Sequence, residues 1–197
     1  MRTAILDTLN VVHPSHALPV VIAMVWIAVE LLSLPKSRAQ LRLEHGDWLS
    51  IALGTVPAVG AGAALLHEFP QPAKLVSVSF VFPGLVLFLA GIGLRIWSRL
   101  SLGRYYTFDI SVTPEHRVTT AGPYRFVRHP LYLGTFLTAA GLPLITQGWM
   151  SVWLFAIPTA AIYGLRLIRE DAYLMTAMGS AYRDYAHRTA RLIPFIW

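Results

Sequence analysis

The chain has 197 residues, of which 55% are hydrophobic and only 13% are charged. Because a soluble domain carries about 25% charged residues, this composition and the mean hydropathy of +0.56 predict an integral membrane protein. The formal charge of +6 does not indicate nucleic-acid binding, since the arginines follow the predicted membrane boundaries, and the lack of cysteine excludes disulfides, thiolate metal sites and cysteine nucleophiles.

The N-terminal part of the chain, residues 1–74, is predicted to be a membrane segment of two helices. The first helix occupies residues 17–34 and is interpreted as a retained anchor, because no small-residue cleavage site follows a short apolar run. The second begins at residue 48, ends at about residue 66, and is rich in glycine and alanine. Small residues allow helices to pack closely in lipid.

The C-terminal part, residues 75–197, is predicted to hold three further spans and the functional core. Its first span, residues 75–97, contains Gly84, Gly91 and Gly93, which again predict close helix contact. The sequence as a whole therefore predicts an all-α membrane protein with about five transmembrane helices.

The last two predicted spans, residues 131–146 and about 150–168, form an apolar hairpin that turns at residues 147–149. The fourth span is short, since the hydrocarbon core requires roughly 20 helical residues. Beyond the hairpin, the charges and tyrosines of residues 169–187 predict an amphipathic helix.

The distribution of positive charge predicts the orientation of the five spans. Of the 16 Lys and Arg residues, only Arg2 and Lys74 fall on one side of the predicted membrane. The positive-inside rule then puts the N-terminus outside and the C-terminus in the cytoplasm. Residues 98–134 and 166–191 share the cytoplasmic face in this arrangement, so they can form one site.

Residues 122–134 read Gly-Pro-Tyr-Arg-Phe-Val-Arg-His-Pro-Leu-Tyr-Leu-Gly and form the densest polar and aromatic motif of the chain. Ionisable side chains at a membrane boundary are costly unless they bind something. The motif alone also fits a positively charged loop end in which Pro130 starts the next helix.

A second polar cluster follows the hairpin. Arg166 and Glu170 are four residues apart and share a helix face, Asp171 follows them, and Gly-x-x-Tyr-x-x-Tyr occupies residues 179–185. By itself the Arg166 and Glu170 pair also fits a surface ion pair, which stabilises a helix by only about 0.2–0.5 kcal/mol.

Taken in order, these features resemble the isoprenylcysteine carboxyl methyltransferase family. The resemblance rests on Arg-His-Pro-x-Tyr-x-Gly, a helical hairpin, an acidic pair, Gly-x-x-Tyr-x-x-Tyr and a Leu-Ile-Pro ending, and it covers about the last hundred residues. It implies a small multi-span enzyme whose C-terminal half binds S-adenosylmethionine without a Rossmann domain.

The resemblance also implies roles for individual residues. Arg166 matches an arginine near the substrate carboxylate, and Arg166 and Asp171 are assigned to catalysis. Arg128 is interpreted as structural or facing the cofactor, and Asp109 is a further candidate. The residues matched to cofactor binding are His116, Val118, Thr119, Tyr124, His129, Pro130, Leu131, Tyr132, Glu170 and Asp171. The family more often has a second glutamate where this chain has Asp171.

The chemistry of these side chains suits that cofactor. Glu170 or Asp171 can meet its cationic part, and tyrosines can pack against the sulfonium or the adenine. A carboxylate acceptor is already ionised at pH 7 and needs no general base, and Arg166 could hold it with a bidentate contact. An amine acceptor would need a proton acceptor, such as His129 or a carboxylate.

The sequence leaves several functions open. The first hypothesis is methyl transfer to a lipophilic substrate from the bilayer, most like a prenylated cysteine carboxylate, with membrane lipids as the other partners and neither metal nor nucleic acid. A phospholipid amine, a small thiol or a prenol-like compound could also accept the methyl group. An NADPH-dependent sterol-type reductase shares a His-Pro-x-Tyr-x-Gly run, and a non-enzymatic membrane protein is a further alternative.

Overall fold

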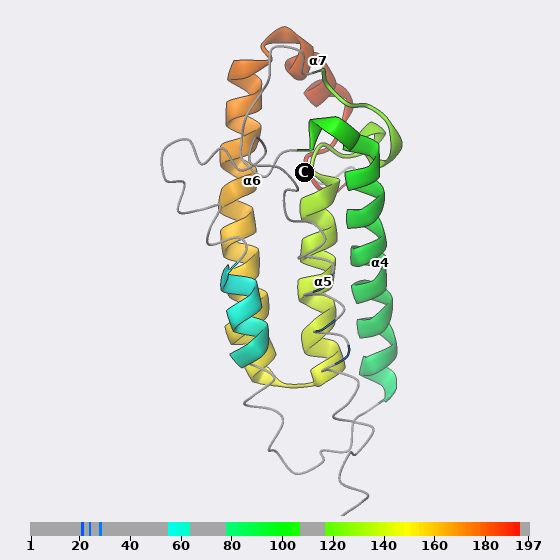
Figure 1. Ribbon diagram of the computed structural model, residues 1–197, viewed down its shortest axis with the longest axis vertical. Helices are drawn as coiled ribbons and strands as arrows, with labels where there is room; N and C mark the ends of the chain where they lie inside the picture. The colour runs from blue at the N-terminus through cyan, green and yellow to red at the C-terminus, as the bar shows by residue number, and fades with distance from the viewer. Residues whose placement is uncertain are drawn as a thin grey trace, which may run out of the picture.

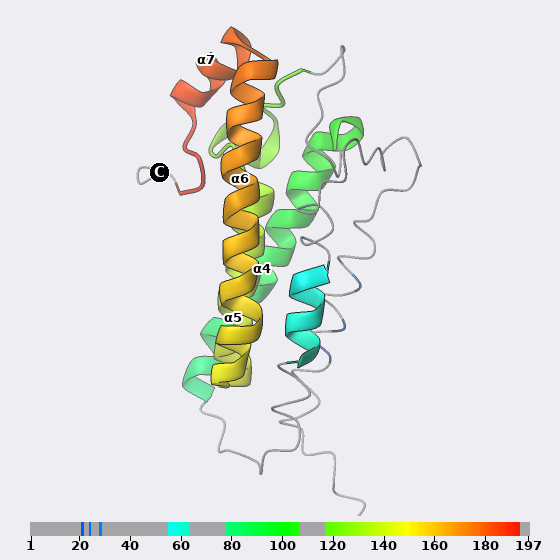
Figure 2. The same ribbon diagram turned by 90° about the vertical axis from the view of Figure 1, so that its left-hand side faces the viewer.

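The computed structural model describes residues 21, 24, 28, 55–63, 78–106 and 117–193. Within these residues all named elements are helical: α4 (Val78–Leu102), η1 (Gly103–Tyr105), η2 (Gly122–Arg125), α5 (Pro130–Thr146), η3 (Ser151–Ala156), α6 (Ile157–Ala177) and α7 (Ser180–Arg188). The helices α4, α5 and α6 run along the long axis of the molecule, and α7 lies at the end where α6 stops (Figures 1 and 2). The predicted all-α class is confirmed for this part of the chain.

Two of the described helices are long and apolar enough to cross a membrane, namely Ser79–Leu102 and Ser151–Ala177, while Pro130–Thr146 is apolar but shorter. These helices overlap the three spans predicted for the C-terminal part, although the first and the last extend five and about nine residues beyond the predicted ends. Residues 55–63, inside the second predicted span, are helical. The rest of that span and nearly all of the first lie outside the described residues, so five spans remain a prediction.

Four glycines allow α4 and α5 to pack closely. A Cβ atom at Gly91 would lie 2.5 Å from the carbonyl oxygen of Gly134, and one at Gly141 would lie 2.7 Å from that of Gly84. The sequence predicted such contact for Gly84 and Gly91, and the structure confirms it. Gly93 has no described atom within 4 Å of its Cβ position, so it does not take part in the contact with α5.

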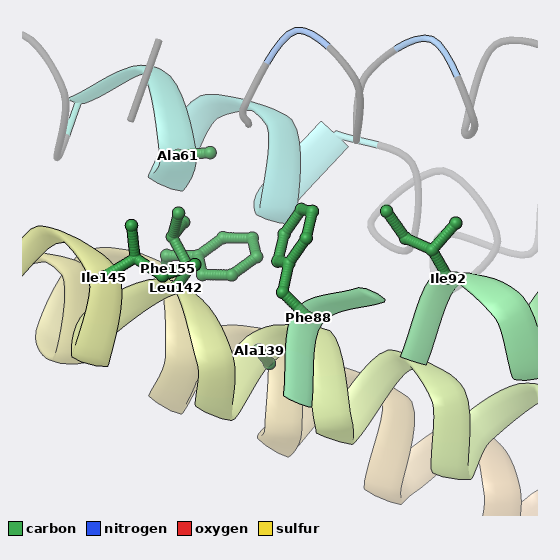
Figure 3. Close-up of a cluster of buried hydrophobic side chains, with 7 residues drawn as sticks. All are labelled: Ala61, Phe88, Ile92, Ala139, Leu142, Ile145 and Phe155. Atoms are coloured by element: carbon green, nitrogen blue, oxygen red, sulfur yellow. The ribbon is translucent and has the colours of Figure 1, made fainter. Parts of the chain in front are cut away.

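The hydrophobic core lies where α4, α5, η3 and the helical residues 55–63 meet. Figure 3 shows Phe88 and Phe155 between the ribbons, with Ala61 above them. Apolar side chains removed from water contribute about 25 cal/mol for each Å² of buried surface. The remaining buried members of this cluster are Ile92, Ala139, Leu142 and Ile145.

The turn between α5 and α6 lies at the opposite end of the bundle from α7 (Figure 1). Gln147 ends α5 with a positive φ of 50°, which confirms the predicted turn. The chain re-enters a helix through the π-helical turn η3. Pro158 has no N–H to donate to the carbonyl of Leu154. The same carbonyl oxygen lies against Gly60, where a Cβ atom would clash with it.

The single amphipathic helix predicted for residues 169–187 is wrong. The residues up to Ala177 continue α6, and a separate helix of nine residues, α7, begins at Ser180. Gly179 separates them with a φ of 60°, a conformation that glycine adopts without a steric penalty. The break turns α7 back over the start of α5, as Figure 1 shows.

Candidate active site

The polar motif lies at the start of α5. Pro123 is the second residue of the short helix η2, and His129 precedes Pro130, the first residue of α5. Proline favours this first helical position because its fixed φ suits the helix and its missing N–H is not needed there. The local sequence therefore sets His129 and Tyr132 at the helix end that faces α6 and α7.

The C-terminal segment, residues 189–192, pairs with this motif through the backbone. The amide of Arg128 donates to the carbonyl of Ala190 at 2.8 Å, and the amide of His129 donates to that of Arg191 at 3.2 Å. Ala190 in turn donates to the carbonyl of Phe126 at 3.2 Å. Two segments about 60 residues apart in the sequence thus form one short parallel contact.

The carboxylate of Asp171 is the buried centre of the site. Its Oδ1 accepts hydrogen bonds from His129 Nε2 at 3.0 Å and from the hydroxyl of Tyr182 at 2.9 Å. Arg191 Nε lies 3.0 Å from Oδ2, and Arg128 Nε lies 3.5 Å from Oδ1. Basic groups from the motif and from the C-terminal segment therefore compensate one buried negative charge.

Two tyrosines attach α7 to the rest of the site. Burial, and then the negative charge of Asp171, raises the pKa of Tyr182 well above its ordinary value, so its hydroxyl stays protonated and donates. The hydroxyl of Tyr185 donates to the carbonyl of Tyr124 at 2.6 Å, and burial raises the pKa of Tyr185 to about 12. At neutral pH, Tyr182 thus ties α7 to α6 and Tyr185 ties α7 to the motif.

Glu170 forms a second centre beside the first. Its Oε2 accepts a hydrogen bond from the hydroxyl of Tyr132 and lies 3.8 Å from Arg166 Nε. The side chain of Arg166 is only 3% exposed, whereas that of Glu170 is 28% exposed. Tyr163 packs edge-on against Tyr132, with ring centroids 5.8 Å apart. This carboxylate is thus held by the protein on one side and accessible on the other.

The structure brings most of the predicted site residues together. His129, Tyr132, Arg166, Glu170 and Asp171 form the two neighbouring centres described above. Tyr124 is buried against α7, Pro130 and Leu131 begin α5, and Val118 and Thr119 are half-buried just before η2. His116 and Asp109 lie outside the described residues.

Sequence reasoning missed Arg191 and Tyr163. Arg191 entered the sequence analysis only as the last residue of the segment 166–191, and Tyr163 was one of many residues in a predicted apolar span. Tyr182 belonged to a noted motif, and its three-residue spacing from Tyr185 is the signal for one shared helix face. Contact between Asp171 and a cofactor stays a prediction, because the described partners of its carboxylate are protein groups.

Comparison with known proteins matches this arrangement to one family. The pattern of the isoprenylcysteine carboxyl methyltransferase (ICMT) family matches residues 84–176. A probable protein-S-isoprenylcysteine O-methyltransferase from Oryza sativa subsp. indica is 30% identical over 130 residues, covering 65% of this chain and 67% of the rice protein. The chain belongs to this family.

Other relatives of this ICMT family member are more distant or match over a shorter length. The protein-S-isoprenylcysteine O-methyltransferase of Schizosaccharomyces pombe is 26% identical over 158 residues, covering 76% of this chain and 67% of the yeast protein. The uncharacterized protein YpbQ of Bacillus subtilis is 34% identical over 80 residues, covering 41% and 48%. The family match contains Arg166, Glu170 and Asp171 together with the whole motif.

Proposed function

We propose that the protein transfers a methyl group from S-adenosylmethionine to a lipophilic carboxylate, the carboxyl group of a prenylated cysteine. The observation that carries this proposal is the Glu170 carboxylate, held by Tyr132 beside the buried Arg166 and still partly exposed. A fixed, accessible anion next to an aromatic ring suits a cationic ligand. A buried guanidinium next to it suits a carboxylate.

Glu170 and Tyr132 would hold the cofactor, with His129 and the first turn of α5 on the side of the adenosyl group. When bound, S-adenosylmethionine supplies an electrophilic methyl group on a sulfonium cation. Tyr132 fixes the carboxylate of Glu170 through its hydroxyl, and the ring of Tyr163 supports Tyr132. Their packing keeps the anion in one orientation, which is what alignment of an in-line displacement requires.

Arg166 would hold the acceptor. A carboxylate acceptor is ionised at neutral pH, so no residue of this chain has to remove a proton. With the acceptor held there, transfer would join its oxygen to the methyl carbon and would leave the electron pair of the broken carbon–sulfur bond on sulfur. The products are a methyl ester and a neutral thioether. Arg166 lies on the long apolar helix Ser151–Ala177, so a headgroup drawn from the lipid would reach it along that helix.

The test measures binding and turnover separately in purified protein. We expect S-adenosylhomocysteine to bind and NADPH not to bind in calorimetry. Glu170→Gln removes the negative charge but keeps the shape, so binding should weaken tenfold or more, which is about 1.4 kcal/mol. The matched control is Asp184→Asn on the exposed face of α7, which should bind like wild type. Equal affinities of Glu170→Gln and wild type would refute the cofactor assignment.

Arg166→Lys tests the acceptor. Lysine keeps the charge but loses the planar fork of the guanidinium. Methyl transfer to N-acetyl-S-farnesylcysteine should fall at least tenfold, while affinity for S-adenosylhomocysteine stays near wild type. Arg183→Lys, an exposed position on α7, is the control. Wild-type turnover in Arg166→Lys, or preferred methylation of phosphatidylethanolamine, would overturn the carboxylate assignment.

A further inference from the structure

The two acidic residues of the site face different surroundings. Consecutive residues of an α-helix do not face each other, and α6 turns Glu170 toward Tyr132 and Arg166. Asp171 instead faces His129, Tyr182 and Arg191. Glu170 keeps an accessible side, but the side chain of Asp171 is only 4% exposed. The pair therefore divides into one residue whose carboxylate keeps an open side and one whose two carboxylate oxygens are both occupied by protein groups.

A buried carboxylate is stable only when hydrogen bonds and opposite charges compensate it. Asp171 obtains this compensation from three separate parts of the chain: the motif through Arg128 and His129, α7 through Tyr182, and the C-terminal segment through Arg191. Arg128 also donates to the carbonyls of Ala186 and Thr189. The carboxylate thereby ties these parts to one another.

The hydrogen bond to Asp171 also determines which nitrogen of His129 carries a proton. A carboxylate only accepts, so Nε2 must donate to it. In the neutral ring, Nδ1 is then left as an acceptor for a hydroxyl or amino group. Meanwhile the backbone amide of His129 is bound by the carbonyl of Arg191. Both the ring and the backbone of His129 are thus fixed by partners outside the motif.

We infer that Asp171 is a positioning residue, which clamps the C-terminal segment 189–192 onto the motif and thereby orients His129 for the cofactor. The inference rests on the proposed function for the identity of the ligand. On this inference the C-terminal segment 189–192 belongs to the binding site, although Asp171 itself does not contact the ligand. It also explains the shorter aspartate at this position, since the carboxylate here serves the interior of the protein.

The test uses the full-length protein and the pair formed by Asp171 and Arg191. Arg191→Gln removes one charged partner of the carboxylate, Asp171→Asn removes the charge itself, and Arg191→Lys restores a cation. Arg188→Gln, at an exposed position three residues earlier, removes the same charge from the end of α7. Two quantities are measured for each: hydrogen exchange of the amides of residues 126–129 and 190, and affinity for S-adenosylhomocysteine.

We expect Arg191→Gln to accelerate exchange at these amides and to weaken S-adenosylhomocysteine binding at least fivefold, with Arg191→Lys in between and Arg188→Gln like wild type. The double variant Asp171→Asn/Arg191→Gln should bind S-adenosylhomocysteine no more weakly than Asp171→Asn, because both changes break the same contact between Asp171 and Arg191. Unchanged exchange in Arg191→Gln would overturn the clamp.

Accelerated exchange with unchanged affinity would overturn the positioning role, since the clamp would then be purely structural. Equal weakening by Arg188→Gln would also overturn it, because any lost cation would have the same effect. Wild-type protein that does not bind S-adenosylhomocysteine would refute the proposed function and the positioning role with it. The exchange data would still decide the clamp, so the two failures are distinguishable.

Discussion

Gly91→Ala should loosen the α4–α5 contact that supports the site. The added Cβ atom would lie 2.5 Å from the carbonyl oxygen of Gly134, which is 0.9 Å inside the 3.4 Å where ordinary van der Waals contact begins. It would also lie 2.8 Å from the amide nitrogen of Thr138. Both neighbours are backbone atoms of α5, so no side-chain rotation relieves the clash and the two helices must separate.

Overpacking of this kind typically costs about 1–3 kcal/mol. The matched control is Gly93→Ala, two residues further along α4, where no described atom lies within 4 Å of the new Cβ. Both variants replace a glycine by alanine inside α4 and so change helix propensity alike. The difference between their melting temperatures therefore reports the clash at Gly91 alone. Melting temperatures in one detergent should differ by roughly 2–4 °C for each kcal/mol. Because α5 carries His129 and Tyr132 at its start, S-adenosylhomocysteine affinity should fall in Gly91→Ala as well. Equal melting temperatures of the two variants would refute the close-contact reasoning.

Two further predictions concern α7 and the membrane orientation. Tyr185→Phe leaves the buried carbonyl of Tyr124 without its donor, so the free energy of unfolding should fall by about 1–3 kcal/mol. Tyr173→Phe, at a side chain that is 41% exposed, should change this free energy little. Equal thermal stability of the two variants would contradict the role of the Tyr185 hydroxyl. The charge distribution predicts that reporter fusions at residues 67–74 and 147–150 report the outer side of the membrane. Cytoplasmic signals from both fusions would refute the predicted orientation with the N-terminus outside.

The helices of the described chain were accessible from the sequence because their signals are local. Apolar length predicted α4, α5 and α6, and Pro130 predicted the start of α5. The break at Gly179 was not predicted, since charged and aromatic residues on both sides suit one amphipathic helix equally well. The positive φ of this glycine ends α6, and α7 beyond it is held by the contacts of Tyr182 with Asp171 and of Tyr185 with the motif.

For the site, too, the sequence predicted the local features and the tertiary structure decided the long-range contacts. The sequence by itself determined that Arg166 and Glu170 share a helix face, that His129 and Tyr132 stand at a helix start, and that this polar cluster occurs beside apolar helices. Only the tertiary structure decided that Tyr132 binds Glu170 and that Asp171 joins His129 to Arg191. Local spacing fixes neighbours within a turn of helix, whereas contacts across 20 to 60 residues depend on how α5, α6, α7 and the C-terminal segment pack around one buried charge.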